Sequence, residues 1–118
     1  MPNPVVHWEV VGKDPEKLQA FYSKLFGWKV DANNPMKYGL VNASGKGDIG
    51  GGIGPRPAKG PKHSGVTIYI AVKDLQAALK KAEKLGGKTV MPITEIPNMV
   101  TLALFADPEG NVIGLVKE

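Results

Sequence analysis

Cysteine is absent from this chain of 118 residues, and histidine occurs only at His7 and His63. Without thiols the chain can form no disulfide, no thiolate zinc site, no cysteine nucleophile and no Cys-x-x-Cys redox pair. A bound metal would have to be held by histidine and carboxylate side chains. With two histidines available, the sequence offers little material for such a site.

Long hydrophobic runs and a strong charge of either sign are also lacking. No apolar run approaches the ~18 residues that a membrane-spanning helix needs, and the start, MPNPVVHWEV, lacks the pattern of a signal peptide. We therefore expect a cytoplasmic protein with no membrane partner. The formal charge of +4 is concentrated in residues 56–63 and 80–88. It favours a solvated basic surface over a nucleic-acid site, and it argues against a cationic ligand.

The sequence repeats itself. HWEVVGKD at 7–14 aligns with TIYIAVKD at 67–74, and the register continues without a gap to residue 30 over residue 90. Each copy predicts a strand, a helix that follows an aspartate N-cap, at Asp14 or Asp74, and three more strands. The predicted strands are 5–11, 28–30, 37–42 and 49–53, then 66–72, 88–91, 100–105 and 111–117, and the helices end at Gly27 and at 86–87.

This pattern predicts an α+β fold of two βαβββ modules, residues 4–53 and 66–118, within one domain spanning 1–118. Residues 54–65, where proline and glycine alternate with positive charge, form a predicted linker or lid. The helix of each module covers one face of its sheet. Two modules can pair the faces left open and enclose a cleft between curved mixed sheets, where a ligand would sit.

The paired βαβββ order, with FYSKLFGW at the first helix end and DPEGN before the last strand, resembles the vicinal oxygen chelate superfamily of glyoxalases, bleomycin-resistance proteins and extradiol dioxygenases. The resemblance covers about residues 4–118 and implies a glyoxalase-like fold and a homodimer. In metal-using members, one residue from the first strand and one from the last strand of each module hold a divalent ion. The matching positions here are His7, Thr67, Gly51 and Gly114.

Only His7 among these four positions offers a metal ligand, so we expect no metal and no other cofactor. An ion held weakly by His7 and Glu9, with His63 or Glu118 joining them, is the alternative. Drug binding of the bleomycin-resistance kind is disfavoured by the positive charge of the chain.

Strand alternation puts His7 and Glu9 on one face and Trp8 on the other, where it should pack beneath a helix. The resemblance makes the His7 face the cleft. The predicted ligand-binding residues are His7, Glu9, Thr67, Tyr69, Gly51 and Gly114. His7 and Glu9 are also the candidate catalytic pair, as base and orienter. The competing interpretation makes His7 a structural histidine and leaves Glu9 facing solvent.

Three functions remain open at this point. The first is a metal-independent protein that binds a small organic molecule in the cleft. The alternative is a small lyase or isomerase that uses His7 and Glu9. The third is a partner-binding module that acts through the basic linker and a helix. The glycine run at 50–54 lacks the spacing of a phosphate loop and predicts open space in the cleft or the close approach of another strand. Whether the modules pair within one chain or exchange between chains is also open.

Overall fold

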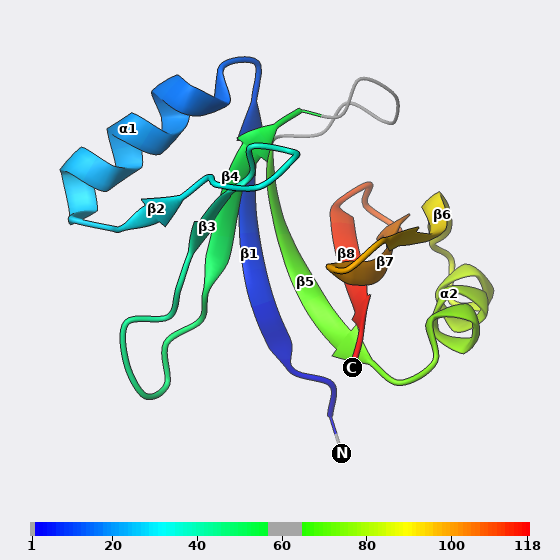
Figure 1. The fold of residues 1–118 in the computed structure, drawn as a ribbon. Coiled ribbons are helices and arrows are strands. Elements are labelled where there is room, and N and C mark those ends of the chain that lie inside the picture. The colour runs from blue at the N-terminus through cyan, green and yellow to red at the C-terminus, as the bar shows by residue number, and fades with distance from the viewer. Residues whose placement is uncertain (1, 57–64) are drawn as a thin grey trace. The chain divides into compact units, whose positions relative to one another are not determined.

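A computed structural model describes residues 2–56 and 65–118 of the chain (Figure 1). Its elements follow the predicted order, βαβββ twice. The first set is β1 (Val5–Gly12), α1 (Pro15–Phe26), β2 (Val30–Asp31), β3 (Gly39–Val41) and β4 (Gly51–Pro55). The second set is β5 (Val66–Val72), α2 (Leu75–Lys84), β6 (Lys88–Ile96), β7 (Val100–Ala106) and β8 (Val112–Lys117). The α+β class and the module order are therefore confirmed.

The chain divides into two compact units. One contains most of β1 together with α1, β2, β3 and β4, and the other contains most of β5 together with α2, β6, β7 and β8. Within the first unit the strands are hydrogen-bonded in the order β2-β3-β4-β1, with β1 parallel to β4. Within the second unit the order is β5-β8-β7-β6, with β5 parallel to β8. Each set of four strands therefore combines one parallel pair with antiparallel pairs, and the strands of the parallel pair are joined by a crossover that includes a helix.

Both helices begin where the sequence predicts. The side chain of Asp14 accepts a hydrogen bond from the Lys17 amide at 3.1 Å, and that of Asp74 accepts one from the Ala77 amide at 3.0 Å. These bonds satisfy amides that have no partner within the helix. Gly27 ends α1 with φ of 70°, a left-handed conformation that costs glycine little.

The helices differ in how they pack. In the second unit α2 buries Leu75 and Leu79 against a cluster that includes Ala103 and Leu115. No residue of α1 is fully buried, and Phe21, Leu25 and Phe26 are each more than half exposed. Beneath α1 lies Ile53 of β4, which is completely buried. The core of the molecule is therefore concentrated under α2 rather than under α1.

Several predicted boundaries shift. Strand β4 begins and ends two residues later than predicted, so its last two residues, Gly54 and Pro55, come from the predicted linker. Residues 57–64 of that segment, His63 among them, lie outside the described residues. Strand β6 continues to Ile96, past the predicted end at Met91, and its pairing with β7 is irregular around Pro92. Proline lacks the amide hydrogen that a regular ladder needs, which accounts for the irregularity.

Candidate functional site

Three side chains of the first unit form a hydrogen-bonded chain. Nε2 of His7 lies 2.9 Å from the hydroxyl oxygen of Tyr38, and that hydroxyl donates to Oε2 of Glu9 over 3.0 Å. The imidazole and phenol rings also stack, with centroids 6.3 Å apart and planes inclined by 22°. His7 and Glu9 lie two residues apart on β1, so they share a face of the strand, as alternation predicts. Tyr38 connects them.

The direction of these bonds fixes the tautomer of His7. A tyrosine hydroxyl has one hydrogen, and in this chain Tyr38 donates it to Glu9. In the short contact between His7 and Tyr38, Nε2 of His7 must then carry the hydrogen and donate it to the hydroxyl oxygen of Tyr38. His7 is therefore the Nε2–H tautomer, with Nδ1 as the acceptor nitrogen of the ring.

Burial disfavours a charge on His7. The ring is only partly accessible, and loss of hydration lowers the pKa of His7 below its ordinary value. The neutral ring is consequently the form present at neutral pH. At neutral pH the chain therefore contains a neutral imidazole, which the hydroxyl of Tyr38 connects to Glu9.

We expect the protein to lose stability as the pH falls below the ordinary histidine pKa of about 6.5. A depressed pKa in the folded state means that the unfolded chain binds the proton more tightly. The contribution of His7 is thus fully present above that pH and declines as the pH falls towards the lowered pKa. Melting temperatures measured from pH 7.5 to 5 test this. His7→Gln, which does not titrate, should flatten the decline, and an unchanged slope would contradict the expectation; His63→Gln measures the share of the other histidine.

The loop before β3 holds Tyr38 in place. The side chain of Asn34 binds both backbone groups of Tyr38, accepting from its amide at 3.0 Å and donating to its carbonyl at 2.7 Å. Lys37, next to it, has φ of 53°, which is uncommon for a residue with a side chain. From α1, Nε2 of Gln19 donates to the carbonyls of Lys37 and Ile53. These contacts tie the loop to α1 and β4.

Glycines of β4 make room for the Tyr38 ring. A Cβ added at Gly52 would overlap the ring and its hydroxyl, and one added at Gly54 would lie 2.6 Å from its Cδ1. Alternate positions on a strand share a face, so the Tyr38 ring lies across these two positions. The glycine run was predicted to leave open space or to allow close approach. In the structure an aromatic ring occupies that space on this face.

Gly51 faces the other way. It pairs with Trp8 in the parallel ladder, and a Cβ added there would overlap the indole. The ladder also pairs Glu9 with Gly52, and Tyr69 with Gly114 in the other unit. Since Glu9 aligns with Tyr69 in the repeat, Gly52 is the counterpart of Gly114. The predicted alignment is wrong by one residue at this strand, and Gly51 does not share a face with His7.

Trp8 packs as expected against the residues around the end of α1. Its ring centroid lies 5.0 Å from that of Trp28, which in turn contacts Tyr22 and Phe26. The indole nitrogen of Trp8 donates to the Ile49 carbonyl at 3.1 Å. Trp8 and Trp28 thus form part of an aromatic cluster on the face opposite His7.

The second unit carries the other predicted site residues. Thr67 and Tyr69 share a face of β5 and are 3% and 6% exposed. The Tyr69 ring covers Gly114 of β8, because a Cβ added there would overlap it. Among the described residues the Thr67 hydroxyl has no hydrogen-bond partner. A buried hydroxyl without a partner is costly, by about 1–3 kcal/mol, so this atom is suited to a water molecule or a polar ligand group. That the two sets of residues line one cavity stays a prediction.

The residues present do not fit the divalent ion that the resemblance implies. Within 2–56 and 65–118 no three histidine, aspartate or glutamate side chains lie close enough together to bind an ion. Of the positions corresponding to the ligand set, Thr67, Gly52 and Gly114 offer no carboxylate or imidazole, and Nε2 of His7 is bonded to Tyr38. Divalent ions need several such donors to replace their hydration.

Sequence reasoning missed Tyr38. It lies in a stretch predicted as a strand, and 31 positions separate it from His7. A signal was nevertheless present. Gly52 and Gly54 occupy alternate positions of a strand, so one face of the strand has no side chains there. An aromatic side chain from a neighbouring segment can pack into the groove that this leaves.

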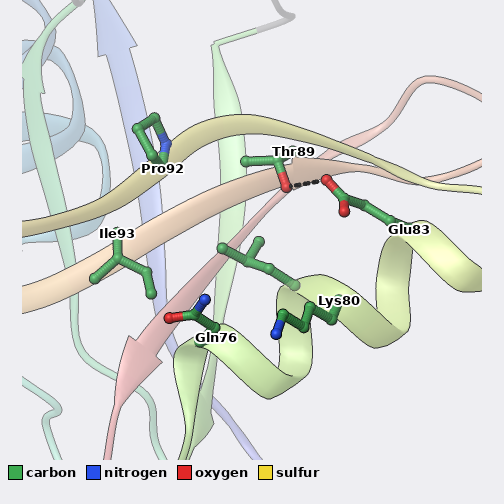
Figure 2. A pocket seen from close by; sticks show the side chains of 7 residues that line it. Gln76, Lys80, Glu83, Thr89, Pro92 and Ile93 are labelled. Atoms are coloured by element: carbon green, nitrogen blue, oxygen red, sulfur yellow. Dashed lines mark hydrogen bonds between the residues drawn. The ribbon is translucent and has the colours of Figure 1, made fainter.

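A groove lies in the other unit, between α2 and β6 (Figure 2). This groove has a volume of about 410 Å³, and Figure 2 shows Glu83 on α2 hydrogen-bonded to Thr89 on β6, at 2.8 Å. Gln76, Leu79, Lys80, Pro92 and Ile93 complete its lining. None of the predicted site residues belongs to it.

The sequence is similar to known proteins of one family. Residues 5–115 match the family model described as the Glyoxalase/Bleomycin resistance protein/Dioxygenase superfamily. A protein of Mycobacterium tuberculosis named "Putative glyoxylase CFP32" is 32% identical over 107 residues, which are 86% of this chain and 41% of that protein. The chain thus spans less than half the length of this relative. A glyoxylase-like domain-containing protein of Didymella fabae is 35% identical over 112 residues, covering 87% of this chain and 84% of that protein.

A solved structure has the same fold as this chain. A superfamily member from Vibrio splendidus aligns with a TM-score of 0.63 at 18% identity, over 99% of this chain and all of that one. At this identity the likeness shows the fold alone. Among the described residues no helix has both the length and the apolar character needed to cross a membrane.

Proposed function

Since this chain belongs to the Glyoxalase/Bleomycin resistance protein/Dioxygenase superfamily, we propose that it is a glyoxalase-like protein that binds a small neutral organic molecule without a divalent metal. The observation that carries the proposal is the chain His7–Tyr38–Glu9. It brings an imidazole, a phenol and a carboxyl group together in the first unit, a polar set that suits a small molecule with hydrogen-bonding groups. The carboxylate of Glu9 repels an anion, and a neutral imidazole does not offset that repulsion.

A ligand screen by thermal shift tests this function. A neutral ligand present at 100 times its Kd should stabilise the protein by about 2.7 kcal/mol. Either His7→Ala or Glu9→Ala should abolish the shift. Ile93→Asp in the groove between α2 and β6 is the control, since Ile93 is exposed and belongs to the other unit. A ligand shift that survives both site variants but is lost in Ile93→Asp would move the function to the groove.

Metal titration tests the metal-free part of the proposal. We expect Ni²⁺, Mn²⁺ and Zn²⁺ to leave the melting temperature unchanged, because the positions equivalent to His7 carry no second or third ligand. Protein purified without chelator should contain metal far below one equivalent. Stoichiometric metal that disappears in His7→Ala would overturn the proposal.

The alternative is a small lyase or isomerase. The observation that favours it is the same hydrogen-bonded chain, because an imidazole connected to a carboxylate is a common arrangement for moving protons. In this case His7 acts as the base and Glu9 orients it through Tyr38. Turnover of a bound ligand, lost in His7→Ala, would select this alternative over simple binding.

We also propose that the protein forms a homodimer in the cytoplasm. The exposed apolar side chains of Phe21, Leu25 and Phe26 on α1 offer a surface for a second copy. Light scattering of the wild type beside Leu25→Glu measures the assembly.

A further inference from the structure

We propose that the groove between α2 and β6 binds a small monoanionic molecule with an apolar body, such as a carboxylic acid. Its volume of about 410 Å³ falls within the range of roughly 300–1,000 Å³ that is usual for small-molecule sites. All of its lining residues lie in the second unit, and none belongs to the chain His7–Tyr38–Glu9. The proposal therefore concerns a second site and does not depend on the proposed function.

The irregular course of β6 shapes the apolar part of the groove. Along a regular strand, consecutive side chains point to opposite faces, yet Pro92 and Ile93 both line this groove. The pairing of β6 with β7 shifts its register between Met91 and Thr94, and such an irregularity re-aims the side chains beside it. Leu79 of α2, which is buried, also lines the groove, while Ile93 is 42% exposed. An apolar ligand body is stabilised by covering Ile93.

The two ends of the groove differ in charge. At one end the Glu83 carboxylate accepts a hydrogen bond from the Thr89 hydroxyl, at 2.8 Å. This end is also where α2 terminates, and the dipole of a helix places partial negative charge there. Figure 2 shows the ammonium nitrogen of Lys80 pointing towards Gln76 and away from the Glu83 carboxylate. An anionic head group is therefore favoured at the end formed by Gln76 and Lys80.

Lys80 and Gln76 have the groups that bind a carboxylate. The lysine ammonium provides a positive charge and hydrogen-bond donors, and the side-chain amide of Gln76 provides two more donors. Among the described residues that line the groove, Lys80 is the one cation, so it matches a single negative charge on the ligand. Residues 75–88 contain four lysines and one glutamate, and this excess of positive charge attracts an anion to α2.

A matched pair of probes tests the charge requirement. The probes are para-tert-butylbenzoate and its neutral analogue para-tert-butylbenzamide, which share an apolar body and differ in the head group. In proton–nitrogen-15 spectra of the full chain, the benzoate should shift the amide signals of α2 and β6 saturably, with a Kd of about 1 mM. The benzamide should bind about fivefold more weakly, the upper limit for an exposed ion pair. Equal affinity for both probes, or no saturable shift in α2 and β6, would overturn the proposal.

Charge variants of α2 locate the head group. Lys80→Gln should weaken benzoate binding about fivefold and leave benzamide binding as it was. Lys81→Gln is the control, because Lys81 is the exposed neighbour of Lys80 but does not line the groove. It should change benzoate binding by less than about twofold, since solvent screens a charge that does not contact the ligand. Equal weakening in the two variants would mean a general attraction to α2 and would overturn the site.

A variant on β6 tests the apolar part of the groove. Ile93→Asp puts a carboxylate where the ligand body would lie, so it should abolish binding of both probes. Ile93 is exposed, and an unchanged melting temperature shows that the variant is folded. Benzoate binding that survives in Ile93→Asp would overturn the proposal, and so would its loss in His7→Ala. Because His7→Ala abolishes only the ligand shift of the proposed function, failure of one proposal is distinguishable from failure of the other.

Discussion

Replacing Gly114 with alanine is expected to lower the free energy of unfolding by about 3 kcal/mol, the upper part of the range for an overpacked interior. The added Cβ would overlap the ring of Tyr69, which faces Gly114 across the pairing of β5 with β8. Tyr69 is only 6% exposed, so its ring cannot turn aside without displacing its neighbours. Calorimetry should record a fall in melting temperature of roughly 10 °C.

A double-mutant cycle identifies the cause. Tyr69→Ala removes the ring, so Gly114→Ala in that background should cost little more than Tyr69→Ala alone. The difference between the two costs is the coupling between positions 69 and 114. If Gly114→Ala is equally damaging with and without the Tyr69 ring, steric overlap is not the reason for glycine at this position.

The elements that the sequence predicted well are those whose signals are local. Asp14 and Asp74 cap helices through amides three residues away, and Gly27 ends a helix by its own backbone conformation. The repeat added a second, independent copy of each signal. These features depend on a few neighbouring residues, and the structure confirms them.

The site depends on contacts that are distant in sequence. Tyr38 reaches His7 and Glu9 only because β3 and β4 bring its loop beside β1, and no pattern in residues 37–42 specifies that approach. The register of β4 was equally hard to predict. Shifting a strand by one residue turns every side chain to the other face, which is why Gly51 was assigned to the His7 face instead of Gly52.

Strand β6 shows a different reason for error. The predicted strand ended at Met91, directly before Pro92, and a proline in a central strand breaks its ladder. In the second unit β6 stands last in the order of strands and pairs only with β7. A strand bonded on one side tolerates proline where its amide is not needed, so β6 continues to Ile96. Position in the sheet decided the outcome, and the sequence of the strand alone does not reveal that position.

Replacing Gly52 with alanine is expected to disable the site. The new Cβ would overlap the ring and hydroxyl of Tyr38, which is only half-buried and can tilt away. We expect a loss of stability of about 2 kcal/mol, with the tilt breaking the hydrogen bonds from Tyr38 to His7 and Glu9. The His7 imidazole should then lose its Nε2–H preference in nitrogen-15 spectra, and ligand-induced stabilisation should disappear.

The neighbouring glycine provides the matched control. Gly51→Ala would overlap Trp8 on the opposite face of the same strand. Its cost in stability should be similar, because another aromatic ring must move, but the hydrogen bonds of His7, Tyr38 and Glu9 lie on the other side of the sheet. We therefore expect the His7 spectrum of Gly51→Ala to match the wild type. If both substitutions change the His7 spectrum equally, the cause is a general destabilisation of β4. The space that Gly52 leaves for the Tyr38 ring would then not be what positions Tyr38.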